Sequence, residues 1–383
     1  TDLKFRLSYG KTGNQDGIGN YAWQPLMSGG INYGNNSGMA VTSMGNNTLT
    51  WETADQYDFG FDLGFWNGKL NMIADVYLKN TNNLLYSMPL HGTSGFTSVT
   101  SNIGSMRNYG VEFSINGHMN LGKVNWTSSF NISHNKNKLT KLLGDDLLPI
   151  GANRALKVGE ELGAFYLFKM DGIYQYDGEV PQPLYDLGVR AGDVKYHDVD
   201  NNGIINDSDR QLVGSSNPDF FGGWNNTFKY KGFQLDVFFT YMYGNDVYAE
   251  WAVTATRPGY RMAITEDAAK NRWTAPGSSN KYPRAVNTLC GHNSKNSTRF
   301  LEDGSFIRLR SLTFSYTFPQ VMLQKIRMKG LRLYVQGDNL LLFSKYSGWD
   351  PEVSKNMDPQ YFGVDLYGVP PSRSVNFGIN LSF

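Results

Sequence analysis

The stretch from Ser372 to Phe383 constrains the fold of this chain more than any other. It reads SRSVNFGINLSF, and because side chains along a strand alternate between two faces, it divides into two sets. One face carries Val375, Phe377, Ile379, Leu381 and Phe383, and the other carries Asn376, Gly378, Asn380 and Ser382. The edge strand of a soluble β-sandwich would show the same period. An unbroken apolar stripe that ends on an aromatic residue is, however, typical of a strand in an outer-membrane β-barrel, with lipid outside and a polar lumen inside.

The same alternation recurs along the chain and predicts an all-β fold. It indicates ten strands, over residues 3–10, 57–65, 70–78, 109–116, 124–132, 221–230, 233–241, 311–318, 331–336 and 375–383. Dipeptides such as Asn67-Gly68 predict tight turns at one end of the strands. The connections at the other end are long, roughly 11–50, 81–103, 136–216, 246–300 and 344–371. A soluble sandwich spreads loop length over both ends, whereas an outer-membrane barrel has short turns on one side and long external loops on the other.

One apolar region, residues 158–175, does not fit the count of ten strands. A single further crossing would place the next strands in the wrong direction. We therefore expect residues 158–175 to form structure within the long external loop 136–216, not a membrane crossing.

Composition excludes several classes of protein. The chain has 35 Lys and Arg against 34 Asp and Glu. It therefore lacks the excess of positive charge that is typical of nucleic-acid-binding proteins. No window approaches the ~20 apolar residues of a membrane helix, so a membrane-spanning form of this chain would be a barrel. The single cysteine, Cys290, excludes an internal disulfide framework and is expected to be a small loop residue.

The segment from Asp198 to Asp209 reads DVDNNGIINDSD and predicts a calcium loop. Calcium takes about seven oxygen ligands, and a twelve-residue loop supplies them from positions 1, 3, 5, 7, 9 and 12, with glycine at position 6. The predicted ligands are Asp198, Asp200, Asn202, the Ile204 carbonyl, Asn206 and Asp209, with Gly203 at the turn. Position 12 is Asp in place of the usual Glu, and flanking helices are not expected. The alternative is an Asp/Asn/Gly turn without an ion.

No catalytic constellation is visible, and we expect a protein that is not an enzyme. The sequence contains no G-x-S-x-G, no glycine-rich phosphate loop and no H-E-x-x-H. Carboxylates on the inward-facing sides of the strands are expected to be solvated side chains that line the lumen. The alternative is that two of them form a pair for general acid–base catalysis. Aromatic residues in the long loops could stack on sugars, but packing among the loops is favoured; these are Trp23, Trp251, Trp273, Tyr346 and Trp349.

Several motifs resemble the C-terminal part of SusC/RagA-type TonB-dependent transporters of Bacteroidetes outer membranes. They are NIGSMRNYGVE (102–112), GDVKYHDVDNNGIINDSDR (192–210), NRWT (271–274), YPR (282–284), FIRLRSLTFSYTFP (306–319), GDNLLLFSKYSGWDPE (337–352) and the closing stretch. The motifs occur in the family's order along nearly the whole chain. Each is weak alone, and the set together is specific.

This resemblance implies a 22-stranded barrel with an N-terminal plug, energised by TonB and capped by a SusD-like surface lipoprotein that captures glycans or peptides. Residues 1–383 would then be the C-terminal part of that barrel, in contact with outer-membrane lipid. The plug, the route to TonB and the remaining strands would belong to a separate polypeptide or one outside this sequence. The expected location is the outer membrane of a Gram-negative, Bacteroidetes-type bacterium. The alternative is a calcium-stabilised all-β surface module, such as an adhesin, without transport; an enzyme is a distant third.

Overall fold

The computed structural model describes residues 2–144, 147–259, 262–286, 291–324, 327–357 and 361–383. Cys290, expected to be a loop residue, lies outside the described residues. No helix in the described part of the chain is long and apolar enough to cross a membrane.

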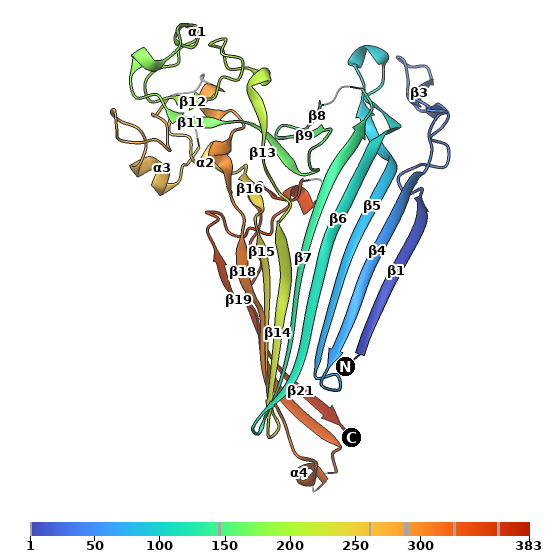
Figure 1. Cartoon of the computed structure of the whole chain (residues 1–383). Coiled ribbons are helices and arrows are strands. Elements are labelled where there is room, and N and C mark those ends of the chain that lie inside the picture. The colour runs from blue at the N-terminus through green and yellow to red at the C-terminus, as the bar shows by residue number, and fades with distance from the viewer. Residues whose placement is uncertain (1, 145–146, 260–261, 287–290, 325–326, 358–360) are drawn as a thin grey trace.

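One large antiparallel sheet organises the molecule (Figure 1). Its ten strands follow one another in chain order, each hydrogen bonded to the next. They are β1 (Asp2–Asn14), β4 (Glu52–Phe65), β5 (Leu70–Pro89), β6 (Ser98–Leu121), β7 (Val124–Leu142), β14 (Phe220–Tyr230), β15 (Phe233–Tyr243), β18 (Phe306–Thr317), β19 (Gly330–Ser344) and β21 (Ser374–Ser382). Each of the ten predicted segments falls on one of these strands.

Short turns join the strands in pairs at one end of the sheet. Residues 122–123 and 231–232 make two-residue turns, and residues 66–69 join β4 to β5. Lys231 and Gly232 both have positive φ (45° and 88°), the backbone that a twisted two-residue hairpin requires. The connection from β18 to β19 is longer and contains the helix α4 (Gln320–Gln324).

The prediction of a long connection over residues 81–103 is wrong. β5 continues to Pro89 and β6 begins at Ser98, so only residues 90–97 connect them, with a short 3₁₀ turn, η1 (Gly92–Ser94). The register between the two strands shifts around Asn82, Leu84 and Leu85. Such bulges reverse which residues face each side, so the period of two that marks a strand in the sequence is interrupted there.

At the end of the sheet opposite the short turns, three connections fold together. We call residues 143–219, 244–305 and 345–373 the loop assembly. Its strands are β8 (Leu147–Ile150), β9 (Arg154–Lys157), β10 (Ala164–Phe168), β11 (Met170–Ile173), β12 (Val194–Tyr196), β13 (Arg210–Ser215), β16 (Asp246–Ala249), β17 (Leu301–Asp303) and β20 (Val364–Asp365). Its helical turns are η2 (Asp177–Glu179), α1 (Gln182–Asp186), η3 (Asp207–Asp209), α2 (Ala252–Ala255), α3 (Glu266–Lys270), η4 (Gly291–Ser294), η5 (Thr298–Phe300) and η6 (Lys355–Met357). A separate hairpin, β2 (Leu26–Gly29) with β3 (Met39–Ser43), belongs to the connection that joins β1 to β4 along the chain.

Most of the buried core lies in the loop assembly, and a smaller cluster joins Ile103 of β6 and Leu139 of β7 to Leu156 of β9. One cluster joins all three connections through Phe165, Tyr248, Tyr346 and Val364. A second cluster, around Tyr174, Val194 and Tyr196, packs beneath α1. The region 158–175 contributes β10 and β11 to small sheets of this assembly and no strand to the large sheet.

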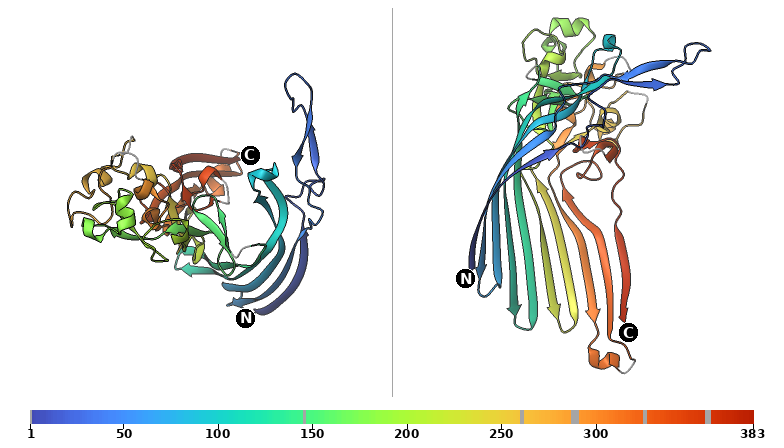
Figure 2. Two further views of the ribbon diagram at one scale, coloured as in Figure 1. Left: turned by 90° about the horizontal axis from the view of Figure 1, so that it is seen from above. Right: turned by 90° about the vertical axis from the view of Figure 1, so that its right-hand side faces the viewer.

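The large sheet is curved, and its two edge strands stand apart (Figure 2). Among the described strands, β1 pairs only with β4, and β21 pairs only with β19. The all-β architecture is confirmed, while closure into a 22-stranded barrel stays an expectation.

Candidate functional site

A continuous apolar face is the first functional feature of the large sheet. The register aligns Phe5, Phe61, Ala74, Phe113 and Ile132 in one row across β1 to β7. It aligns Trp126, Phe228, Leu235, Phe314, Val335 and Phe377 in a second row from β7 to β21. Alternation along each strand therefore places apolar side chains from all ten strands on one face.

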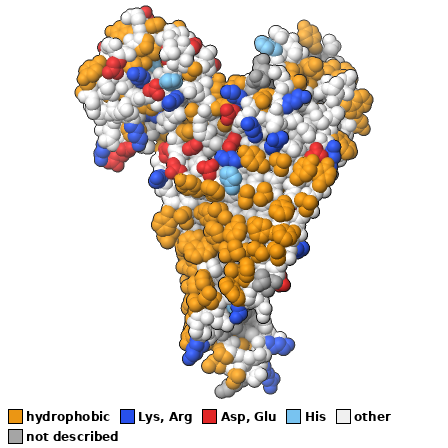
Figure 3. Space-filling model, viewed as in Figure 1, with side chains coloured by type: hydrophobic (Ala, Val, Ile, Leu, Met, Phe, Trp, Pro, Cys, Tyr) orange, Lys and Arg blue, Asp and Glu red, His pale blue; other side chains and the backbone are white. Residues whose placement is uncertain are grey.

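These apolar side chains are exposed, unlike those of a soluble core. Leu7 is 83% exposed and Phe377 is 84% exposed. In Figure 3 the hydrophobic side chains form a broad band across the sheet, and the charged ones gather mainly above and below it. A soluble monomer rarely exposes an apolar patch larger than a few hundred Å², so a band of this extent requires an apolar environment.

The opposite face of the sheet is polar and hydrogen bonded. The Arg6 guanidinium lies 2.9 Å from a carboxylate oxygen of Asp62 and 2.8 Å from one of Asp75. Asp236 accepts a hydrogen bond from the Thr227 hydroxyl at 2.6 Å. One apolar and one polar face on the same strands are the signature of a transmembrane barrel wall.

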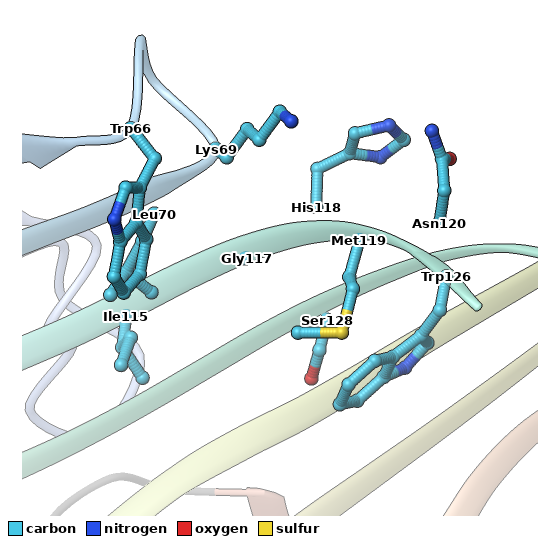
Figure 4. A pocket seen from close by; sticks show the side chains of 10 residues that line it. All are labelled: Trp66, Lys69, Leu70, Ile115, Gly117, His118, Met119, Asn120, Trp126 and Ser128. Atoms are coloured by element: carbon cyan, nitrogen blue, oxygen red, sulfur yellow. The ribbon is translucent and has the colours of Figure 1, made fainter.

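At the end of the apolar band that lies near the short turns, the surface contains a hollow of about 610 Å³ (Figure 4). Here β6 continues past the turn between β4 and β5. The Trp66, Leu70, Met119 and Trp126 side chains lie on one side of β6, and Lys69, His118 and Asn120 project from the other (Figure 4). The Trp126 indole N–H donates to Asn226 at 3.1 Å. Tryptophan beside polar groups is typical of the membrane–water interface.

The predicted calcium loop lies between β12 and β13. Carboxylate oxygens of Asp198, Asp200 and Asp209 lie within 4.8 Å of one another. No ion pair neutralises any of the three among the described residues. Asn202 and Asn206 occupy the same loop, where their side-chain oxygens accept hydrogen bonds from the backbone N–H groups of Ile204 and Ser208, at 2.7 and 2.8 Å.

Backbone N–H groups fold this loop around its carboxylates. Asp209 is fully buried, and its two oxygens accept from the N–H groups of Val199 and Asn206 at 2.9 and 2.8 Å. Burial raises the pKa of the Asp198 carboxyl, but hydrogen bonds, first that from the Gly203 N–H at 2.7 Å, outweigh burial and hold this pKa below its usual value. Gly203 has φ +77°, which the turn requires. Three clustered, unpaired carboxylates and a preformed turn fit a hard divalent cation.

The loop aromatic residues divide into packed and exposed groups. The Trp251 indole N–H donates to the Tyr346 hydroxyl, and the Trp273 indole N–H donates to Gln175, each at 3.1 Å. Trp23 and Trp349 are 56% and 76% exposed. Packing therefore accounts for Trp251, Trp273 and Tyr346, and the other two remain available for contact.

Sequence reasoning did not find the ion pairs of Arg308, in β18, and of Arg284, in the loop assembly. Arg308 pairs with Asp350 and Glu352, 42 and 44 positions away, and Arg284 pairs with the fully buried Asp193. No local motif marks such pairs. The one signal in the sequence is that Arg308 stands between Ile307 and Leu309 in β18.

The comparisons with known proteins agree with this geometry. Residues 1–340 match the family model described as TonB dependent receptor-like, beta-barrel. The chain belongs to this TonB-dependent receptor β-barrel family. TonB-dependent receptor P3 of Formosa agariphila is 33% identical over the whole chain, which covers 39% of that receptor. TonB-dependent receptor SusC of Bacteroides thetaiotaomicron is 28% identical over the whole chain, which covers 38% of SusC.

Solved structures extend the family likeness to three dimensions. The RagAB peptide transporter matches the whole chain with a TM-score of 0.85 and 27% identity, over 41% of its own chain. The chain thus spans about two fifths of the length of the TonB-dependent receptors it matches. TonB-dependent receptors of the SusC type are outer-membrane proteins of Bacteroidetes, and this is the location of the present chain.

Proposed function

We propose that this protein forms part of a TonB-dependent outer-membrane transporter that imports glycans or peptides. The observation that carries the proposal is the ten-strand meander with one exposed apolar face and one polar face, superposable on the RagAB peptide transporter. The apolar face contacts outer-membrane lipid, and the polar face lines the route of the substrate.

The proposal includes three protein partners. The edge strands β1 and β21 pair with the remaining strands of the barrel, because an unpaired backbone edge in hydrocarbon costs several kcal/mol per group. A plug within the complete barrel connects it to TonB. A SusD-like lipoprotein meets the loop assembly and closes over the lumen, as the similarity to SusC and RagAB supports.

Growth of a deletion strain tests the transport proposal. A Bacteroidetes strain that lacks the gene is grown on single oligosaccharides or oligopeptides as the sole carbon or nitrogen source. A transporter predicts lost growth on at least one of them, restored by the intact gene only when TonB is functional. Unchanged growth on every substrate, with lost adhesion of cells to glycans, would support the surface adhesin instead.

We also propose that calcium binds the loop 198–209 in a structural role. The ligands are Asp198, Asp200, Asn202, the Ile204 carbonyl, Asn206 and Asp209. The three unpaired carboxylates within 4.8 Å support this, since their mutual repulsion is relieved by a cation. Bound calcium would fix the loop against the cluster around Tyr174 and Val194, which the neighbouring Ile205 side chain joins.

A further inference from the structure

A mostly apolar cavity of about 410 Å³ lies between the large sheet and the loop assembly. Leu84, Ile103 and Leu139 line it from β5, β6 and β7, and Leu156 lines it from β9. Its volume falls in the range of small-molecule sites. The transport proposal assigns no role to this cavity.

Among the described residues that line the cavity, Arg154 of β9 is the only one with a cationic side chain. It is 8% exposed. Its two terminal nitrogens donate to the Ser216 hydroxyl at 3.3 and 3.2 Å, and one of them also donates to the Phe362 carbonyl. The guanidinium carbon lies 4.7 Å from the centre of the Phe165 ring. The buried Nε has no hydrogen-bond partner, and Arg154 forms no ion pair among the described residues.

Other arginines of this chain, the buried Arg308 and the partly buried Arg284 and Arg299, are compensated differently. Arg308 and Arg284 pair with carboxylates. Arg299 has no carboxylate either, but each of its three nitrogens donates to a protein oxygen, among them the Thr256 carbonyl and hydroxyl. Arg154 combines the lack of a counter-charge among the described residues with an unused donor and an adjacent cavity. Burial lowers the pKa of Arg154 to about 10, so the side chain is still cationic at neutral pH.

A buried charge without a partner is costly, and an anion from outside the chain would offset that cost. We propose that this cavity binds a small molecule that carries one carboxylate on an aliphatic body. The carboxylate pairs with Arg154, whose planar fork suits a carboxylate, and the aliphatic part fills the space between Ile103, Leu139 and Leu156. A dianionic phosphate would need a second cation, and no other residue lining the cavity supplies one.

Two sources share this chemistry: a free aliphatic acid and the C-terminal residue of a peptide with an aliphatic side chain. Binding is a property of the cavity and does not require that the protein transports anything. Calorimetric titration of the protein in non-ionic detergent distinguishes the sources with two pairs of probes. Octanoate is compared with octan-1-ol, and N-acetyl-leucine is compared with its amide.

We expect octanoate, N-acetyl-leucine or both to bind at least tenfold more tightly than the uncharged analogue. The probe that shows this preference identifies the source. Arg154→Met should abolish the preference. Lys157→Met, an exposed position of the same strand, should leave the preference unchanged.

Leu156→Phe fills the cavity while it keeps the guanidinium, and it serves as the second test if Arg154→Met does not fold. It should weaken binding of the acid at least tenfold. The proposal is overturned if neither acid binds better than its uncharged analogue. It is also overturned if folded Arg154→Met retains the preference, or if Leu156→Phe binds the acid as tightly as the unmodified protein; Arg154 would then be a structural cation only.

Discussion

At the scale of single residues, two ionic contacts, one of them buried, attach the loop assembly to the end of β18. The Arg308 guanidinium lies 2.7 Å from Asp350 and 2.9 Å from Glu352, and the Arg308 and Asp350 side chains are almost fully buried. The pair joins a sheet strand to the connection after β19. Removal of Asp350 leaves the buried Arg308 largely uncompensated, with the partly exposed Glu352 as its remaining counter-charge.

Asp350→Ala should therefore lower the free energy of unfolding by roughly 3 kcal/mol, the low end of the range for a broken buried pair, because Glu352 remains beside Arg308. The double variant Arg308→Met with Asp350→Leu should recover most of that loss, because it removes both charges. Thermal unfolding in detergent measures both variants. Equal destabilisation by the single and double variants would contradict the assignment to an uncompensated charge.

Phe314 tests the lipid-facing assignment. Its ring stacks on Phe233 at 5.8 Å in the apolar band, and its neighbour Thr313 lies on the polar face. Phe314→Arg should destabilise the inserted sheet by about 2–4 kcal/mol if Phe314 lies near the bilayer midplane, and Thr313→Arg should cost far less. The folded fraction on a heat-modifiability gel compares the two. Equal folded fractions would show that the faces are assigned wrongly.

Sequence reasoning predicted the face of such residues because a strand has a period of two. It placed Phe314 outward and Thr313 inward without any structure. It could not predict Ser315, on the same polar face but only 2% exposed, where it accepts a hydrogen bond from Arg332 at 3.1 Å. Nor could it predict Arg154 or Arg308, because their surroundings come from segments far away along the chain.

At the scale of structural elements, the loop 198–209 is the clearest case for a metal-dependent segment. Asp198→Ala with Asp200→Ala should raise proteolytic cleavage between about residues 190 and 215, because the cation would no longer hold the loop. The large sheet should stay intact. Chelation of the unmodified protein should have the same effect, reversibly, when cleavage sites are mapped by mass spectrometry.

Asp207→Ala is the matched control for this loop. Asp207 is exposed, pairs with Arg210 at 3.1 Å and lies outside the predicted ligand set. Its substitution should leave the cleavage pattern dependent on calcium. A pattern that ignores calcium in the unmodified protein would reduce the segment to a polar turn.

We expect the stability of the loop assembly around η4 to depend on pH, because this turn contains a buried histidine. His292 is buried, its Nε2–H donates to the Val194 carbonyl at 2.7 Å, and its ring meets Tyr196 edge-on. Burial, more than the nearby Lys295, lowers the pKa of His292, although Val194 and Asp193 act in the opposite direction. Below the ordinary histidine pKa of about 6.5 the unfolded segment therefore binds a proton that the folded segment resists.

The neutral His292 side chain should make its full contribution to the stability of this segment above about pH 6.5. That contribution should fall as the pH drops below this value, until the imidazole is protonated in the folded protein as well. Hydrogen exchange of residues 191–197 and 291–300, corrected for its intrinsic pH dependence, measures this. His292→Gln should remove the effect, and a substitution of the half-exposed His197 should not. Equal protection at pH 7.5 and pH 5 would refute the prediction.

Strand existence was predictable from the sequence, whereas strand length was not. The alternation around Tyr109 and Phe113 predicted β6, but the register shift beside Met106 concealed its first half. The small sheets of the loop assembly were also missed. Phe165, Leu167 and Phe168 of β10 are all buried, so no polar face alternates with an apolar one.

At the scale of the whole molecule, the apolar band governs behaviour in solution. Exchange of the purified protein into buffer without detergent should cause aggregation, because the band across all ten strands would face water. Size-exclusion chromatography with light scattering measures this. A monodisperse monomer without detergent would favour the soluble surface module over a membrane wall.

The loop assembly is attached to one end of the large sheet, and the strand pairing of the sheet is fixed at the other end. Short turns fix the register of neighbouring strands at one end, and the three connections of the loop assembly all leave from the other. Residues can therefore be inserted into, deleted from or exchanged within the loop assembly without a shift in the pairing of any two wall strands. Related chains can therefore differ in their loop assemblies while the wall keeps its strand pairing, its apolar face and its polar face. A graft of one relative's loop assembly onto another's strands would show whether the loop assembly determines specificity in this family.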